Sequence, residues 1–470
     1  MIMTFAAIFA AVLSCEAAFL ALSTFLPLSP GSLNLAAGVV LGALAAFALV
    51  KSLRLHRRFR AGGQAGTGAA LVALLAAASL CVVLAVKAVW HGRLESLRLE
   101  VAARGWPTSL AEFQEDLPDA SYAQSALEQA AAKLDLAGPV KKDLQAWGGD
   151  LLDSAGGPKA GGTWGRLCPT VDGLVDKACQ GRTRLAKTDY VAAAKDPLNM
   201  PLPKMAQLPT AARLLRACAS RQPAARAWAQ VDRQWRLAAL AGTHRSLIAQ
   251  LVAVDMETLG VKTALDILQR QPRAVLPDRL ARAFRQRLGR NRVSEGLRAE
   301  LAMHLDIPAS LGRGWAGGAL AWSGVIDLNV LATARMVARD AAVQTMSEAR
   351  AAQQLCDAEL QALPSWPYFL ARVAMPSFGQ LYVREFEGRD WARLALLSSA
   401  AARFRAARGR WPAALAELAP RFCEPGDLRD ETAGTGFVLR AKGGGFELCA
   451  GGLKGDGKDF RGAEFCARVK

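Results

Sequence analysis

Residues 51–60, KSLRLHRRFR, decide how the rest of the chain is arranged. This stretch carries five basic side chains and lies between two long apolar segments. Short loops rich in Lys and Arg resist transfer across a membrane, so residues 51–67 are expected on the cytoplasmic side. The apolar segment that follows is then expected to deliver the remaining chain to the opposite face.

Three apolar segments surround this loop, and each is a candidate membrane span, although the second is short. They are Met3–Leu28, Leu33–Val50 and Ala69–Trp90, and roughly 20 residues are needed to cross a hydrocarbon core. The sequence therefore predicts a multi-pass protein of a bacterial inner membrane, with a cytoplasmic N-terminus. Residues from about 93 to 470 are expected in the periplasm or outside the cell. A cleavable signal peptide is the competing interpretation of the first segment, although no basic stretch precedes it.

Polar and small residues within these segments suggest specific roles. Glu16 is an ionisable group at membrane depth, which makes it a functional candidate. A structural carboxyl kept neutral by burial is the alternative, because no charged residue within the first two segments can pair with it. Gly38 and Gly42 allow close helix packing, either between the first two spans or between two copies of the chain. Lys87 and Trp90 are expected to mark the outer membrane boundary.

The exported part is long enough for one or two buried cores and is strongly basic. The whole chain has 470 residues and a net charge of +17. A dense arginine cluster lies on a helix that is expected to begin after Pro277 and to end near Gly289. The candidate polyanion-binding residues are Arg279, Arg282, Arg285, Arg287, Arg290 and Arg292, flanked by Arg273 and Arg298. Anionic lipid, an acidic wall polymer or nucleic acid could bind them, and the alternative is a solvated helix face.

The cysteines indicate an oxidised structural framework and no metal site. None of the nine forms a Cys-x-x-Cys pair, and the chain has only four histidines. In an oxidising compartment we expect Cys168 to pair with Cys179 and Cys449 to pair with Cys466. Cys218 lies on an apolar helix face and is expected in the core.

The exported part is predicted to be mainly α-helical, with a small β-containing module at its end. Apolar residues recur every three or four positions over 228–265 and again over 376–408, whereas 437–449 alternates around glycines and predicts a hairpin. The predicted units are a three-span domain at 1–92, a helical extension with a Trp-Pro turn at 93–153, a Gly- and Pro-rich loop at 154–206, a helical domain at 207–375, and a long helix with an α+β module at 376–470.

One stretch of sequence occurs twice. Residues 106–113, WPTSLAEF, are matched by residues 411–418, WPAALAEL. Each copy follows a helical pattern and a glycine, and Pro is favoured at the first position of a helix. We therefore expect a recurring turn in which Trp closes the corner and a short helix packs back on the preceding long one. Chance in an alanine-rich chain is the alternative.

A resemblance to a known class covers roughly the last 90 residues. The run Gly409-Arg410-Trp411-Pro412, the following Leu415, Leu418 and Pro420, and the tail Gly455–Asp459 carry it. This plan resembles the C-terminal module of uncharacterised, largely helical bacterial envelope proteins and is similar to that of type II secretion pseudopilins. The resemblance implies an envelope setting and no activity. Pseudopilin tails can hold calcium, but Asp456 and Asp459 are too few ligands and are also typical of a tight turn.

Motifs of common enzymes are absent from the sequence. There is no Gly-x-Ser-x-Gly, no Walker motif and no His-Glu-x-x-His. The best remaining constellation is His244, Asp255 and Glu257, with His304 and Asp306. On one helix, His244 and Asp255 would lie about 16 Å apart, too far for a hydrogen bond. Ordinary structural roles are therefore the main interpretation, and no catalytic residue, cofactor or metal is predicted.

The sequence favours an envelope protein that acts through binding, as a scaffold or in assembly. The expected partners are the lipid bilayer, another envelope protein, a second copy of the chain, or an anionic polymer. Two alternatives stay open, namely an envelope hydrolase with an unrecognised carboxylate site and a basic surface that binds nucleic acid or another polyanion.

Overall fold

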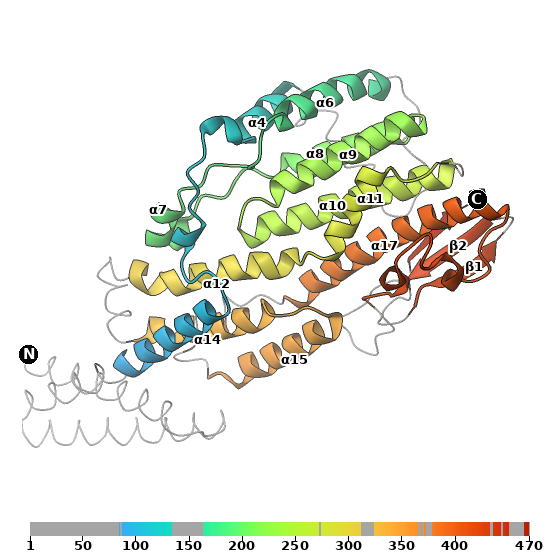
Figure 1. Ribbon diagram of the computed structural model, residues 1–470. Coiled ribbons are helices and arrows are strands. Elements are labelled where there is room, and N and C mark those ends of the chain that lie inside the picture. Colours follow the sequence, from blue (N-terminus) through green and yellow to red (C-terminus); the bar gives the residue numbers. More distant parts are fainter. Residues whose placement is uncertain are drawn as a thin grey trace, which may run out of the picture.

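The computed structural model is mainly helical with a small antiparallel sheet near the C-terminus, as predicted (Figure 1). The structure describes residues 84, 87–133, 163–271, 274–311, 324–364, 368, 371–372, 378–432, 436–442, 445–450 and 465–469. Glu16, the Gly38–Gly42 pair, the tail carboxylates Asp456 and Asp459 and nearly all of the three predicted spans lie outside these residues. Within the described part of the chain, no helix is long and apolar enough to cross a bilayer.

α-Helices make up most of the described structure and stack in successive rows (Figure 1). They are α4 Gln124–Lys133, α6 Thr163–Cys179, α7 Tyr190–Lys195, α8 Gln207–Ala219, α9 Ala224–Ala241, α10 Leu247–Arg270, α11 Asp278–Leu288, α12 Arg292–Leu311, α14 Val325–Asp340, α15 Met346–Ala362 and α17 Gly379–Arg408. Short 3-10 helices are η1 Leu110–Phe113, η2 Asp119–Ser121, η3 Pro197–Asn199, η4 Leu415–Leu418 and η5 Pro425–Leu428.

A further helix covers residues 87–103 and continues from the end of the third predicted span. Its residues Leu94, Leu97 and Val101 are buried at helical spacing against α12 and α14. Trp90 was predicted at the membrane interface, but it is only 5% exposed and packs in the same cluster. The indole therefore fixes this helix to the helical body.

The apolar interior has three main clusters, and α17 joins two of them. The first core lies between helix 87–103, α12, α14, α15 and the N-terminal half of α17. The second core lies between α9, α10, α11, the C-terminal half of α17 and the sheet. The third core is formed by α6, α8, α9 and α10. Since nearly every face of α17 is buried, this helix is the central helix of the fold.

Local sequence signals place several helix ends where they were predicted. α11 follows Pro277 and ends at Gly289. α17 ends at Gly409, which has the left-handed φ of 71° that glycine adopts without strain. The apolar pattern over 228–265 belongs to two helices, α9 and α10, because the chain turns at 242–246 and Ser246 caps α10.

The sheet has three strands in the order β1-β2-β3: β1 Val438–Lys442, β2 Gly445–Ala450 and β3 Phe465–Val469. The predicted hairpin is β1 and β2, which pair antiparallel with Lys442 opposite Gly445. β2 is central and wholly buried, and its Phe446 and Leu448 pack in the second core. The sheet thereby packs against the C-terminal half of α17.

The prediction of a loop over 154–206 is wrong for the part that the structure describes. Residues 163–179 form α6 and residues 190–195 form α7. Val171 and Val175, one helical turn apart, are buried in the third core with Leu185. The Gly-, Pro- and Lys-rich composition hid this spacing, and α6 even contains Pro169 within its helix.

The two similar stretches of sequence fold into the same turn. In each copy a glycine with positive φ ends a helix, the Trp-Pro pair follows, and Leu110–Phe113 or Leu415–Leu418 forms a 3-10 helix. Glu112 and Glu417 each accept hydrogen bonds from the backbone N–H groups just before the 3-10 helix. The prediction that Pro begins the short helix is wrong, because each 3-10 helix begins three residues after its proline.

Candidate functional site

Four charged residues of α17 are buried where the first and second cores meet. They are Glu385, Arg389, Asp390 and Arg393, each at most 6% exposed. Residues of α17 up to 386 pack in the first core, and those from 392 onward pack in the second. Because a buried charge is costly unless it is paired, this junction requires partners from other elements.

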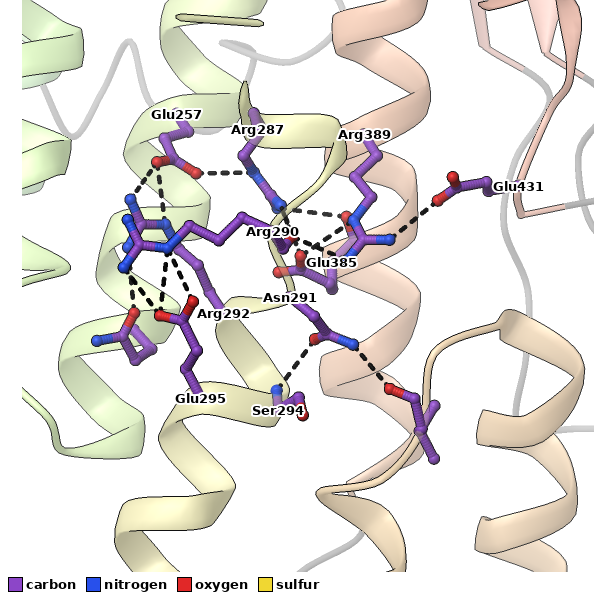
Figure 2. A network of polar contacts seen from close by, with 12 residues as sticks. Glu257, Arg287, Arg290, Asn291, Arg292, Ser294, Glu295, Glu385, Arg389 and Glu431 are labelled. Atoms are coloured by element: carbon purple, nitrogen blue, oxygen red, sulfur yellow. Dashed lines mark hydrogen bonds and ion pairs between the residues drawn. The ribbon is translucent and has the colours of Figure 1, made fainter. Parts of the chain in front are cut away.

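Glu257 of α10 binds two buried arginines at once (Figure 2). Its Oε2 lies 2.7 Å from Nε of Arg287, and its Oε1 lies 2.5 Å from Nη2 of Arg292. Arg287 also donates from Nη1 to Glu385 Oε1 at 2.5 Å. Burial alone would lower the pKa of the Arg287 guanidinium, but Glu385 and Glu257 together raise it above its ordinary value. These ion pairs connect α10, the end of α11, the start of α12 and α17.

The Arg292 side chain packs directly against Gly242, where any larger residue would clash with it. Its Nη1 donates to Gln250 Oε1 at 3.1 Å, and the guanidinium lies against Gly242 at the end of α9. A Cβ on Gly242 would come within 1.9 Å of Arg292 Nη1. The position of the buried Arg292 side chain therefore depends on a glycine at residue 242, in the α9–α10 turn.

The network continues from α17 into the C-terminal module (Figure 2). Arg389 contacts Glu385 at 3.3 Å and Glu431 at 3.2 Å, and Arg393 also donates to Glu431. Glu431 follows η5, so these bonds fix the C-terminal module to α17. We name this whole set of ion pairs the ionic junction; its members are Glu257, Arg287, Arg292, Glu385, Arg389, Arg393 and Glu431.

A pair of buried carboxyls lies beside the ionic junction. Asp390 and Asp430 are both fully buried, and their side chains share a hydrogen bond. Asp390 also accepts from the backbone N–H groups of Glu431 and Thr432, each at 2.9 Å. Burial and the neighbouring Asp430 raise the pKa of Asp390 to about 7. A hydrogen bond between two carboxyls requires a proton, and the raised pKa of Asp390 keeps one on that side chain below about pH 7.

A pocket of about 380 Å³ lies between α9 and α11, next to the ionic junction. It is lined by six arginines and two carboxylates: Arg236, Arg279, Arg282, Arg287, Arg290, Arg292, Asp232 and Glu257. Five of the six predicted polyanion-binding residues line it, and Arg285 does not. Arg287 and Arg292, however, are 3% and 2% exposed, so they cannot belong to an outer basic surface. The exposed arginines of the predicted set are Arg279, Arg282 and Arg290, with Arg285 partly exposed.

The residues considered for catalysis are not brought together. His244 is buried within hydrogen-bond distance of Thr188 Oγ1 and Ser246 Oγ, at 3.1 and 2.9 Å. Burial lowers the pKa of His244 to about 4, so its ring is neutral at physiological pH. Asp255 lies on the surface, 4.0 Å from Arg384, while Glu257 points into the ionic junction.

His304 and Asp306 also have structural contacts. His304 Nδ1 lies 2.7 Å from the carbonyl oxygen of Glu300. Asp306 accepts from the Leu110 N–H at 2.8 Å and from Ser109 Oγ at 3.1 Å, so it caps η1. Each of the five candidate residues therefore has a structural contact within the fold.

One predicted disulfide partner is wrong. Cys168 of α6 is bonded to Cys218 of α8, with Cα atoms 5.6 Å apart. Cys179 is a free thiol, and burial raises its pKa to about 11. Spacing along the chain favoured Cys179, but α6 keeps residues 168 and 179 three helical turns apart. At the other end, Cys449 is disulfide-bonded, and the strand register places it directly opposite Cys466, its predicted partner.

Sequence reasoning missed the charged residues of α17, although a signal was present. Glu385, Arg389 and Arg393 recur every four residues inside a helix that is otherwise rich in buried apolar side chains. Charged residues four positions apart lie on the same side of a helix, and within an apolar pattern they indicate a buried row of ion pairs. Their partners could not be identified, because Glu257 and Arg287 come from distant parts of the chain.

Comparisons of the chain with models of known protein families, with characterised proteins and with solved structures find no match. Among the described residues, no group of three or more His, Cys, Asp or Glu side chains is arranged to hold a metal ion.

Proposed function

We propose that this chain is a membrane-anchored protein of the bacterial envelope that acts by binding, as a scaffold or in assembly. In this proposal the three N-terminal apolar segments anchor it in the inner membrane, and residues from about 93 to 470 lie in the periplasm or outside the cell. The helix over 87–103 would then connect the third span directly to the first core.

The observation that carries the proposal is the Cys168–Cys218 disulfide. It joins α6 to α8 across a sequence separation of 50 residues. Disulfides persist in oxidising compartments and are rare in the cytoplasm. The bonded state of Cys449 supports the same location.

A binding role is favoured over catalysis because of how the polar groups are used. Glu257, one of the carboxylates considered for a hydrolase, is paired with Arg287 and Arg292. His244 is neutral and enclosed by Thr188 and Ser246. Another envelope protein or a second copy of the chain is therefore the proposed partner. An anionic polymer is a further one, because Arg279, Arg282 and Arg290 are exposed.

The oxidation state of Cys168 and Cys218 in living cells tests this proposal. Cells are quenched with acid, the protein is denatured, and thiols are alkylated with a mass-tagged maleimide before or after reduction. We expect both cysteines to react only after reduction, while Cys356, a free thiol, reacts in both samples. Reaction of Cys168 and Cys218 without reductant would contradict the proposed location.

A further inference from the structure

The pocket between α9 and α11 has two facing walls with complementary chemistry. On α9, Asp232, Trp235, Arg236 and Ala239 follow the spacing of one helix face. On α11 and the turn after it, the lining residues are Arg279, Arg282, Ala283, Gln286 and Arg290, again one face. Each helix thus directs guanidinium groups toward the same space.

Several guanidinium groups around the pocket have unused donors. Arg282 is exposed and makes no ion pair with any residue that the structure describes. Arg279 contacts Asp232 through Nε at 3.2 Å, and no described residue pairs with either of its Nη groups. Arg290 uses Nε and Nη2 on Glu295, so its Nη1 has no partner in the described part of the chain. The pocket is therefore rich in donors that an anion could accept.

The carboxylates at the pocket are already neutralised by fixed partners. Glu257, at its inner side, contacts Arg287 and Arg292. Asp232 contacts Arg236 at 3.3 Å and Arg279 at 3.2 Å, so it links the two walls. Among the residues that the structure describes, Arg282 has no carboxylate partner, and no buried carboxylate has to be displaced for an anion to approach it.

The pocket also offers an apolar surface beside the arginines. Trp235 lines it and is held in place by Phe284, with ring centroids 4.8 Å apart. A volume of about 380 Å³ is within the range of small-molecule sites and exceeds what a single inorganic anion needs. A ligand that fills it would carry a body able to pack against the indole.

We infer that this pocket binds the phosphoryl group of an organic phosphate. Guanidinium groups from two walls suit an acceptor with three oxygens and a charge of up to about −2, whereas a carboxylate offers two oxygens and a single charge. The remainder of the ligand packs on Trp235. This site recognises one group in a defined cavity, and it does not depend on the cellular location proposed above.

Calorimetric titration of the full-length protein in an uncharged detergent tests the inference. The probes are phenyl phosphate, inorganic phosphate and benzoate, and the variants are Arg282→Ala and Arg285→Ala. Arg285 lies on the same helix outside the pocket, where it pairs with Glu424 at 3.4 Å, so it is a matched control. We expect phenyl phosphate to bind in a saturable manner and at least about tenfold more tightly than benzoate. Arg282→Ala should weaken it about tenfold or more, with Arg285→Ala unchanged.

The inference is overturned if phenyl phosphate shows no saturable binding, if benzoate binds as tightly, or if both variants lose affinity equally. Vesicles with and without phosphatidylglycerol then distinguish the sources of the phosphoryl group. Vesicle binding that Arg282→Ala abolishes assigns a lipid headgroup. Binding of phenyl phosphate alone assigns a free phosphate ester.

Discussion

At the scale of single residues, the fold depends on a few buried charges that bind two or three partners each. Glu257 has two buried arginine partners, and Glu385 connects Arg287 with Arg389. Buried ion pairs are costly to form, and they are still more costly to break singly, because an uncompensated charge is left in the interior. The ionic junction therefore makes the position of each helix depend on the others.

Removal of Glu257 tests this dependence. The Glu257→Ala variant leaves Arg287 and Arg292 buried without their shared carboxylate, so we expect the free energy of unfolding to fall by about 3–5 kcal/mol. Asp255→Ala is the matched control on the same helix, since its partner Arg384 is 4.0 Å away at the surface. That change should cost less than about 1 kcal/mol in urea unfolding. Similar losses for the two variants would refute the role of the buried network.

The Asp390–Asp430 pair predicts a dependence of stability on pH. The pKa of Asp390 is raised from its ordinary value to about 7, so the folded protein binds a proton that the unfolded chain releases above pH ~4. The stabilisation from this proton is complete below the unfolded pKa and is lost as the pH rises through 7.

An Asp430→Asn variant should reduce this pH effect, because it removes the contribution of Asp430 and leaves that of burial. The amide can donate to Asp390 without a titrating proton, and with the N–H groups of Glu431 and Thr432 it favours the ionised form of Asp390. The pKa of Asp390 should therefore be lower than in the parent chain, although burial still raises it. We expect thermal unfolding of the variant to change less between pH 5 and pH 8 than that of the parent chain. An unchanged difference between the two pH values would exclude proton sharing at this pair.

At the scale of elements, local signals predicted the helices better than the contacts between them. Pro277, Gly289 and Gly409 act on the backbone beside them, and the ends of α11 and α17 lie where these residues predicted. The burial of Arg287 and Arg292 could not be foreseen, because it depends on partners 30 to 98 residues away. The same reason explains why Cys168 was given the wrong partner.

The helix-ending glycine offers a direct test at this scale. Gly409 has a φ of +71° with nothing within 4 Å of an added Cβ, so only backbone strain opposes a side chain there. Gly409→Ala should destabilise the protein by about 1–2 kcal/mol. Gly426→Ala also meets open space but has no positive φ, so it should be neutral or slightly stabilising. Equal effects in denaturant unfolding would argue against the left-handed cap.

The disulfide between α6 and α8 is a second test of how elements are joined. A Cys168→Ser, Cys218→Ser double variant loses a covalent link across 50 residues, so we expect the free energy of unfolding to fall by about 2–4 kcal/mol. Cys179→Ser in the same helix changes only a free thiol and should have a much smaller effect. Melting curves in the absence of reductant compare the three proteins, and equal melting temperatures would contradict the structural role of the bond.

At the scale of the whole molecule, the central helix α17 contacts two apolar cores, the small sheet and the ionic junction. α17 contributes to both cores, and Glu431 joins the C-terminal module to its middle. The helix over 87–103 enters the first core directly after the third predicted span. In the proposed arrangement the helical body is therefore attached closely to the membrane, and its arginine pocket faces the periplasm or cell exterior.

The location of the C-terminus tests the central claim most directly. Two reporters are fused in turn after Lys470, one that becomes active only where disulfides form and one that fluoresces only when it folds in the cytoplasm. We predict activity of the first and no fluorescence from the second, with both fusions present in the membrane fraction. A fluorescent fusion with an inactive oxidation-dependent reporter would contradict the membrane orientation and the envelope function proposed from it.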